Sequence, residues 1–132
     1  MLSTFAAIFL GVFATFLFVL AVLVVVRPTV MERFFLGFAS TAKIHFTEQS
    51  VRLAIGIALV LRAPEMAMSV VFQWIGWTIV GTTVALVLLP WRWHHAFAQV
   101  VLPMVVRFMK FYALGLFLFG VFLLYGLIGA SA

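Results

Sequence analysis

Three long runs without a charged residue constrain this chain more than any other feature of its sequence. They are Leu2–Val26, Met66–Leu89 and Phe111–Ala130, and Gln73 interrupts the second. A helix needs about 20 consecutive apolar residues to cross the hydrocarbon core of a bilayer. Each run reaches that length, so each predicts a membrane-spanning helix.

The composition supports a membrane protein. Of the 132 residues, 67% are hydrophobic and 8% are charged, whereas soluble domains hold about 25% charged residues. A soluble domain of this length could not bury so much apolar surface. The first run is longer than the apolar segment of a signal peptide and follows no basic segment, so we expect a permanent span there.

A fourth span is predicted between Lys43 and Arg62, although Arg52 interrupts its apolar residues. The nineteen residues from Lys43 to Arg62 rise about 28 Å along a helix. That length is close to the hydrocarbon thickness of about 30 Å. Arg52 lies ten residues from Arg62 and is therefore predicted near the middle of the membrane.

The fourth span carries a polar face made by His45, Glu48, Gln49 and Arg52. A charge at the centre of a spanning helix costs about 2.5–3.5 kcal/mol, so this face must avoid lipid. Glu48 and Arg52 have the spacing and order that favour an ion pair. Two interpretations stay open: the face fixes helix packing or an oligomer interface, or it lines a path or headgroup site open to the cytoplasm.

Two connectors, residues 27–43 and 90–110, mix charged with large apolar residues. They predict amphipathic helices that lie in the membrane interface. The second begins with PWRWHH, whose residues we expect to anchor the chain at headgroup depth. These anchor residues are Trp91, Arg92, Trp93, His94 and His95.

The basic residues predict the orientation of the spans. One, Arg62, falls in the turn between the fourth span and the run that follows it, and six fall in the connectors. Because Lys and Arg concentrate on the cytoplasmic side, the connectors are predicted to be cytoplasmic and both termini extracytoplasmic. Anionic lipid headgroups, and not nucleic acid, are the expected partners. The six basic residues are Arg27, Arg33, Lys43, Arg92, Arg107 and Lys110.

The predicted fold is therefore all-α, a single transmembrane domain over residues 1–132 with four spans and two interfacial helices. Pro28 and Pro90 each end a long apolar run, and LAIGIAL from Leu53 resembles YALGLFL from Tyr112. These similarities suggest a tandem repeat of a two-span unit, residues 1–63 and 64–132. A bundle without internal repeat is the alternative.

Short patterns predict how the spans meet. In the turn RAPE, Pro64 suits the first turn of the next helix and Arg62 can pair with Glu65. Small residues four apart allow close helix contact in lipid. Such pairs occur in all four spans: Ala7 with Gly11, Ala54 with Ala58, Gly81 with Ala85, and Gly126 with Ala130.

The second half contains a further pattern: a span that ends in proline, a stretch with tryptophan, a Leu-Pro pair, two basic residues and a glycine-containing span. The positions are Pro90, Trp93, Leu102 with Pro103, Arg107 with Lys110, and Gly115 with Gly120. Over about a third of the chain, this pattern resembles the small two-span bacterial inner-membrane proteins of the YjeT type, although the basic residues are adjacent in that family and separated here. The resemblance implies a bacterial inner-membrane location, and the family's function is unassigned.

The sequence shows no signature of an enzyme. GxSxG, HExxH and glycine-rich phosphate loops are absent, as are cysteine and aspartate. We expect no cofactor and a non-enzymatic membrane protein, oligomeric or accessory to a larger membrane complex. The alternative is a small channel or carrier for an ion, a proton or a lipid headgroup. A quinone or haem site near His45, His94 and His95 is a third hypothesis, although no acidic residue adjoins the His94–His95 pair to complete a metal site.

Overall fold

The computed structural model describes residues 1–37 and 41–129, and these residues are almost entirely helical. They contain no β-strand, which confirms the all-α prediction for this part of the chain. A short 3₁₀ turn, η1 (Ala63–Glu65), follows the third helix. The described residues form α1 (Leu2–Val26), α2 (Pro28–Leu36), α3 (Ala42–Arg62), α4 (Ser69–Leu88), α5 (Trp91–Arg107) and α6 (Met109–Gly129).

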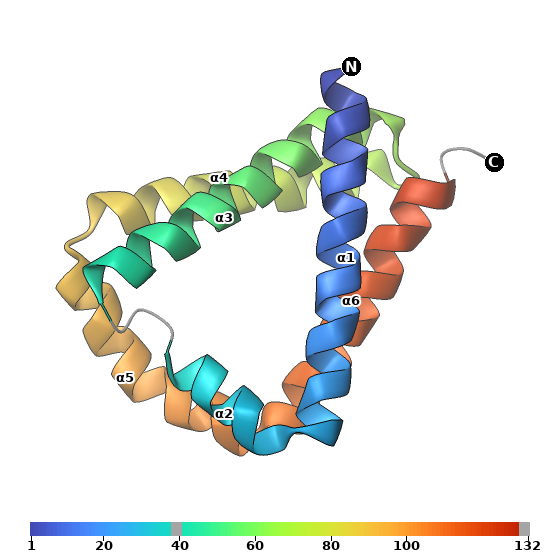
Figure 1. Ribbon diagram of the computed structural model, residues 1–132. Coiled ribbons are helices and arrows are strands. Elements are labelled where there is room, and N and C mark those ends of the chain that lie inside the picture. Colours follow the sequence, from blue (N-terminus) through green and yellow to red (C-terminus); the bar gives the residue numbers. More distant parts are fainter. Residues whose placement is uncertain (38–40, 130–132) are drawn as a thin grey trace.

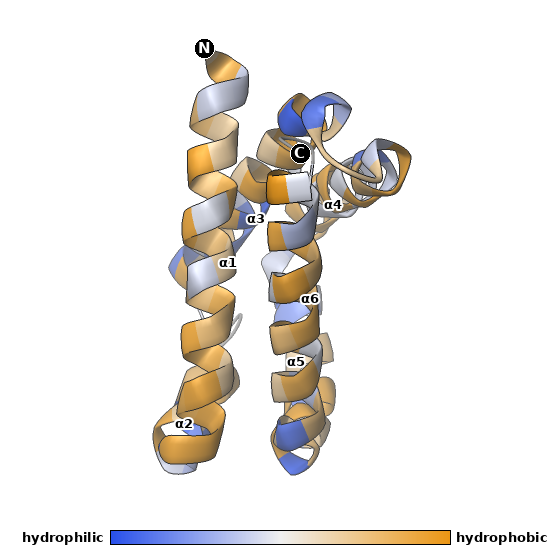
Figure 2. Ribbon diagram, turned by 90° about the vertical axis from the view of Figure 1, so that its right-hand side faces the viewer, coloured by the Kyte–Doolittle hydropathy of each residue, from blue (hydrophilic) through white to orange (hydrophobic). Residues whose placement is uncertain are grey.

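The helices pair two by two along the sides of a triangle (Figure 1). α1 lies beside α6, α2 beside α5, and α3 beside α4. The first half of the chain forms one layer and the second half forms the other, so the chain runs round the triangle and then back (Figures 1 and 2). α1 also packs against α3 at the corner where their pairs meet.

Within the described ranges, four helices are long and apolar enough to cross a membrane. They are α1, α4, α6, and α3 together with η1. Figure 2 shows α1 and α6 hydrophobic along most of their length. This arrangement is consistent with the predicted multi-pass membrane protein.

Proline and threonine mark where helices begin. Pro28 is the first residue of α2, a position where its missing N–H breaks no helical hydrogen bond. Pro90 directly precedes α5. The side chain of Thr41 caps α3 by accepting a hydrogen bond of 3.1 Å from the backbone N–H of Ile44. The ends of the long apolar runs are thus helix boundaries, as predicted.

The turn between α3 and α4 is longer than predicted. Pro64 lies in η1 and not in the first turn of α4, so that prediction is wrong. α4 begins at Ser69, after Met68, whose φ of 55° places it in the left-handed region. A residue with a side chain rarely adopts that region. The backbone therefore makes two separate turns here before the next span begins.

The last predicted span is confirmed with a shifted start. α6 begins at Met109, two residues before the predicted Phe111. Its predicted end at Ala130, and the pairing of Ala130 with Gly126, lie outside the described residues. Gly126 itself is buried, and its carbonyl accepts a hydrogen bond of 2.9 Å from the backbone N–H of Ala67. This bond fixes the end of α6 against the turn that precedes α4.

A polar cluster fastens the start of α1 to the turn after α3. Arg62 Nη1 lies 3.0 Å from Glu65 Oε2, which confirms the predicted ion pair. Arg62 Nη1 also donates to Ser3 Oγ at 3.1 Å, and Ser3 Oγ donates to Glu65. An exposed ion pair contributes about 0–1 kcal/mol to stability. The main role of this cluster is therefore to fix the start of α1 against the turn after α3.

The best-packed core lies at the corner where α1, α3, α4 and α6 converge. Leu10, Leu59, Phe72 and Leu123 come from these four helices and are fully buried. Lipid tails are as apolar as these side chains, so van der Waals packing, and not exclusion from water, favours the contact. Close complementarity at this corner is therefore the main source of its stability.

Glycine allows the closest approach of α3 to α4. A Cβ placed on Gly56 would lie 2.8 Å from Val80 Cγ2 in α4, and one on Gly76 would meet α3. Gly11 and Gly81, which the spacing of small residues predicted as contact points, have no described atom within 4 Å of such a Cβ. The predicted contact role is wrong for these two glycines, because their faces do not point at a neighbouring helix.

Candidate functional site

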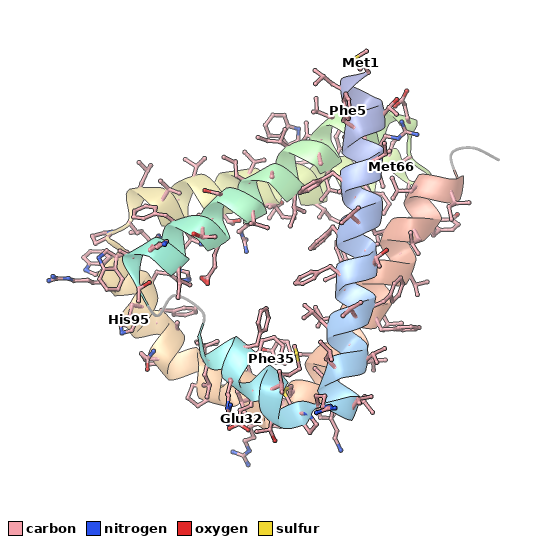
Figure 3. The ribbon with its side chains drawn as sticks, viewed as in Figure 1. Met1, Phe5, Glu32, Phe35, Met66 and His95 are labelled. Carbon is pink, nitrogen blue, oxygen red and sulfur yellow. The ribbon has the colours of Figure 1, made fainter. Side chains whose placement is uncertain are left out.

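A pocket of about 590 Å³ lies between the three helix pairs, where side chains from all sides project toward the centre (Figure 3). Every helix contributes to its wall. One end is polar, formed by Glu48, Gln49 and Arg52 of α3 and His94 of α5. The remaining wall is apolar, and its aromatic members are Phe13, Phe16, Phe34, Phe97 and Phe119.

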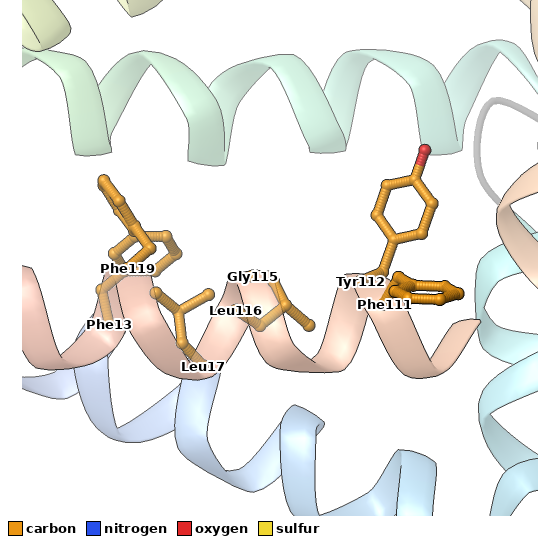
Figure 4. A pocket seen from close by; sticks show the side chains of 7 residues that line it. All are labelled: Phe13, Leu17, Phe111, Tyr112, Gly115, Leu116 and Phe119. Atoms are coloured by element: carbon orange, nitrogen blue, oxygen red, sulfur yellow. The ribbon is translucent and has the colours of Figure 1, made fainter. Parts of the chain in front are cut away.

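A second pocket of about 450 Å³ adjoins the first along α1 and α6. The two pockets share Phe13 and Phe119, so the apolar wall continues from one to the other. Figure 4 shows its lining side chains, among them Tyr112 with its hydroxyl directed away from α6. Together the pockets form a long apolar surface with one polar end.

Arg52 is held by hydroxyl groups of α4. Its Nε donates to Thr83 Oγ1 at 3.1 Å, and its Nη2 donates to Thr82 Oγ1 at 2.7 Å. The predicted polar face of α3 therefore turns toward α4 and the pocket. The predicted ion pair between Glu48 and Arg52 stays a prediction.

The two threonines are oriented by their own helix. Thr82 Oγ1 donates to the carbonyl of Thr78 at 2.8 Å, and Thr83 Oγ1 donates to that of Ile79 at 2.6 Å. A hydroxyl has one proton and two lone pairs. With the protons directed at the backbone, the lone pairs accept from Arg52. These threonines were not singled out from the sequence, and their adjacency in an apolar span was the available signal.

Gln49 and Glu48 complete the polar end. Gln49 is 4% exposed, and its Oε1 has no hydrogen-bond partner among the described residues. Leaving a buried acceptor without a donor costs about 1–3 kcal/mol. Glu48 lines the same pocket from a half-buried position. The pocket thus offers acceptors to an occupant that carries N–H or O–H groups.

His45 and His94 meet beside the polar end. Their Nδ1 atoms lie 2.7 Å apart and their ring centroids 4.8 Å apart. His45 is fully buried, and its Nε2 has no partner within the described part of the chain. The sequence assigned His45 to the polar face of a span and His94 to an interfacial anchor, and it placed the two near each other only in the third hypothesis, a quinone or haem site. Their contact depends on α5 folding back against α3, which no local pattern revealed.

Burial lowers the pKa of His94 below its usual value of 6.5, and the nearby His45 and Arg52 lower it further. Burial acts because it disfavours the charged imidazolium, and the neighbours act because a positive charge nearby opposes a second one. His94 is therefore neutral at pH 7. Its imidazole can accept or donate one hydrogen bond without adding charge to the pocket.

The other predicted anchor and basic residues lie away from the pocket wall. Trp91 is half-buried and its ring meets His95 at a centroid distance of 5.7 Å, while Trp93 is exposed. Contact of these residues with lipid headgroups stays a prediction. The basic residues predicted to be cytoplasmic are all exposed: Arg27, Arg33, Lys43, Arg92, Arg107 and Lys110.

The described residues do not gather three His, Asp or Glu side chains into a cluster that could hold a metal ion. Two imidazoles converge, and a protein zinc site usually takes three or four ligands. The polar end is better suited to hydrogen bonds and ionic contacts with an organic head. Comparison with known proteins adds no constraint, since no family model, curated protein or solved structure matches this chain.

Proposed function

We propose that this chain is a non-enzymatic membrane protein that binds an amphipathic, lipid-like molecule in its central pocket. The two-part lining of the pocket carries this proposal. Aromatic side chains from α1, α2, α5 and α6 form the apolar wall, and charged and amide groups of α3 form the polar end. Binding sites for small molecules are mostly apolar with a few placed polar groups, as this one is.

The position of the polar groups along α3 suits such a ligand. Glu48 and Gln49 lie in the first half of α3, and Ile55 continues the wall with apolar surface. A ligand with its head near the start of α3 would place its tail along Phe13 and Phe119. Polar groups inside a membrane are expensive unless they are satisfied, and a bound head could donate a hydrogen bond to the Gln49 oxygen, which has no partner among the described residues.

An oligomer or an accessory subunit was predicted on three grounds: the missing enzyme signatures, the short loops, and charges within the membrane that need partners. That prediction stays a prediction, and the structure bears only on the third ground. Thr82 and Thr83 of the same chain accept hydrogen bonds from Arg52. Carriage of a lipid headgroup, part of the predicted carrier function, is therefore the better supported proposal.

In this proposal the protein lies in the bacterial inner membrane with α2 and α5 at the cytoplasmic interface and both termini outside. The exposed basic residues near these two helices support that orientation. Each half of the described residues forms three helices, α1–α3 and α4–α6, and the middle helix is the shortest of its three, with 9 residues in α2 and 17 in α5. This arrangement supports the proposed tandem repeat.

Native mass spectrometry of the purified protein tests the proposal. We expect wild-type protein to keep a bound lipid after extended washing in mild detergent. Val101 lines the pocket, whereas the neighbouring Val100 is 73% exposed and lies outside the wall. Val101→Trp should therefore displace the lipid, and the matched variant Val100→Trp should retain it.

Two results would contradict the proposal. One is that the wild-type protein loses all bound lipid as fast as it exchanges the detergent molecules around it. The other is equal lipid retention by the Val101→Trp and Val100→Trp variants, which would place the bound lipid on the outer surface. Both variants introduce the same side chain into α5, so a general effect of tryptophan on folding would appear in both.

A further inference from the structure

We infer that the preferred occupant of the central pocket is a phospholipid whose head carries both a phosphate and a primary ammonium group. The phosphate would contact Arg52, and the ammonium would contact Glu48 and Gln49. This inference rests on the proposed function and names its ligand class. Its basis is the pairing of a cationic donor group with two acceptor groups on one stretch of α3 that lines the pocket.

Arg52 has capacity left for an anion. A guanidinium carries five N–H donors, and the hydrogen bonds to Thr82 and Thr83 use one on Nε and one on Nη2. Both of these partners are neutral hydroxyls, which fix the side chain and leave N–H groups of the guanidinium for an anion. A guanidinium matches the geometry of a phosphate, which accepts two parallel hydrogen bonds from it.

Glu48 and Gln49 supply acceptors suited to an ammonium group. The carboxyl of Glu48 lines the pocket, and the buried Oε1 of Gln49 is without a donor among the described residues. An ammonium has three N–H donors and no acceptor, so it can satisfy the Gln49 oxygen and also donate to the Glu48 carboxylate, which has several lone pairs. A phosphate alone would bring only more acceptors to this side of the pocket.

The spacing of the charged groups fits a head of this kind. Glu48 and Arg52 are four residues apart on one helix, which places their Cβ atoms about 5–6 Å apart. The phosphate and ammonium of an ethanolamine head are separated by a two-carbon chain, a comparable span. The head would thus lie along α3 with its ammonium toward the start of the helix.

The charge balance of the wall disfavours a purely anionic head. Among the described lining residues, Arg52 is the cation and Glu48 is the acid, while His94 is neutral at pH 7. An anionic head would be attracted by the guanidinium of Arg52 but repelled by the carboxylate of Glu48. A zwitterionic head would be attracted by both side chains.

Competition between lipids with identical acyl chains tests the inference. We would add equal amounts of phosphatidylethanolamine, phosphatidylcholine and phosphatidylglycerol to delipidated protein and quantify bound lipid by native mass spectrometry. We expect phosphatidylethanolamine to be favoured by about tenfold or more over both others, as one charge-assisted hydrogen bond would produce. Phosphatidylcholine lacks the ammonium N–H donors and phosphatidylglycerol lacks the positive charge.

Substitutions in the pocket test the contacts with the ammonium and with the phosphate separately. Glu48→Gln should abolish the preference for phosphatidylethanolamine over phosphatidylglycerol, and Arg52→Leu should weaken binding of all three lipids. Arg52→Lys, which keeps the charge, should retain part of the binding even if the leucine variant does not fold. Glu65→Gln removes the carboxyl of the turn, outside the pocket wall, and should leave the preference unchanged.

The outcomes distinguish this inference from the proposed function. Equal retention of the three lipids, or strongest retention of phosphatidylglycerol, would overturn the zwitterionic head while leaving a lipid-binding pocket. An unchanged preference in Glu48→Gln would also overturn it. Failure of wild-type protein to retain any of the three lipids would overturn the inference and the proposed function together.

Discussion

The Nδ1 atoms of His45 and His94 lie 2.7 Å apart and join α3 to α5 beside the polar end of the pocket. A hydrogen bond between two imidazoles needs a proton on one nitrogen and a lone pair on the other. Protonation of both rings would leave two N–H groups facing each other. The contact therefore requires that at least one of the two rings is neutral.

This contact predicts that the folded protein loses stability in acid. The pKa of His94 is lower in the folded protein than its usual value of 6.5. Below about pH 6.5 the unfolded chain thus binds more protons, so stability rises with pH through this range and is fully present above it. The neighbouring charged groups, Arg52 and Glu48 of α3, line the same pocket. Thermal unfolding in detergent, followed by tryptophan fluorescence between pH 5 and 8, measures this dependence.

The matched controls are the two adjacent histidines of α5. His94→Gln should flatten the pH dependence, and His95→Gln should preserve it because it keeps the contact between His45 and His94. A wild-type midpoint temperature that rises on acidification would have the wrong sign for this explanation. An equal flattening by both substitutions would assign the effect to α5 as a whole.

The hydroxyl of Thr83 should contribute measurably to stability through Arg52. Thr83→Val keeps the shape of the side chain and leaves Arg52 Nε without its acceptor at 3.1 Å. Hydrogen bonds between spanning helices contribute about 0.6 kcal/mol on average and up to about 1.7 kcal/mol. We expect a loss in this range, measured by unfolding in detergent mixtures of increasing denaturing strength.

Thr78 provides the control on the same helix. It is exposed, lies one turn before Thr82 and makes no side-chain hydrogen bond to Arg52. Thr78→Val should change the free energy of unfolding by much less than Thr83→Val. Equal effects of the two substitutions would mean that the contact with Arg52 contributes little.

The helices could be predicted from sequence where the bilayer determines the length and composition that a spanning helix must have. A span must be long and apolar, so Leu2–Val26 coincides with α1 residue for residue. Pro28 and Pro90 predicted the starts of α2 and α5, because proline at or just before the first residue of a helix breaks no helical hydrogen bond. Pro103 gave no such boundary, since α5 continues through it. The start of α4 was misplaced, because the left-handed backbone at Met68 has no local sequence signal.

The site depended on which helix lies beside which, and the sequence of one span does not contain that information. Arg52 was predicted to need a polar partner, but the choice of Thr83 follows from the pairing of α3 with α4. The contact of His45 with His94 follows from the packing of α5 against α3. The chemistry of the side chains identified the candidate residues, and the packing of the helices determined which of them are in contact.

Two glycines of α4 that look alike in sequence should respond oppositely to substitution. A Cβ on Gly76 would lie 2.9 Å from Val60 Cγ2 and 3.0 Å from the Val60 backbone nitrogen, so α3 would have to shift. We expect Gly76→Ala to destabilise the protein by about 1–3 kcal/mol. A Cβ on Gly81 has no described atom within 4 Å. Gly81→Ala should be neutral or stabilising by up to about 1 kcal/mol, because alanine is the better helix former.

Thermal unfolding of both alanine variants measures this contrast. A destabilised Gly76→Ala beside an unchanged or stabilised Gly81→Ala would support the close approach of α3 to α4. Equal destabilisation would contradict it and would indicate that the face of Gly81 is also packed. The comparison needs no ligand, so it tests the fold independently of the pocket.

The contact between Ser3 and the turn after α3 predicts a specific cross-link and a common side of the membrane. Ser3 Oγ bonds to Glu65, and the chain contains no cysteine. Thiols introduced by Ser3→Cys and Glu65→Cys should therefore be joined by a short bis-maleimide, and both should react with an impermeant thiol reagent from outside intact cells. Thr29→Cys lies in α2, just beyond the end of α1, and the rise of α1 from Ser3 to Val26 is about 35 Å. It should not cross-link to Ser3→Cys and should react only after permeabilisation. Labelling of all three positions from outside would show that α1 does not cross the membrane.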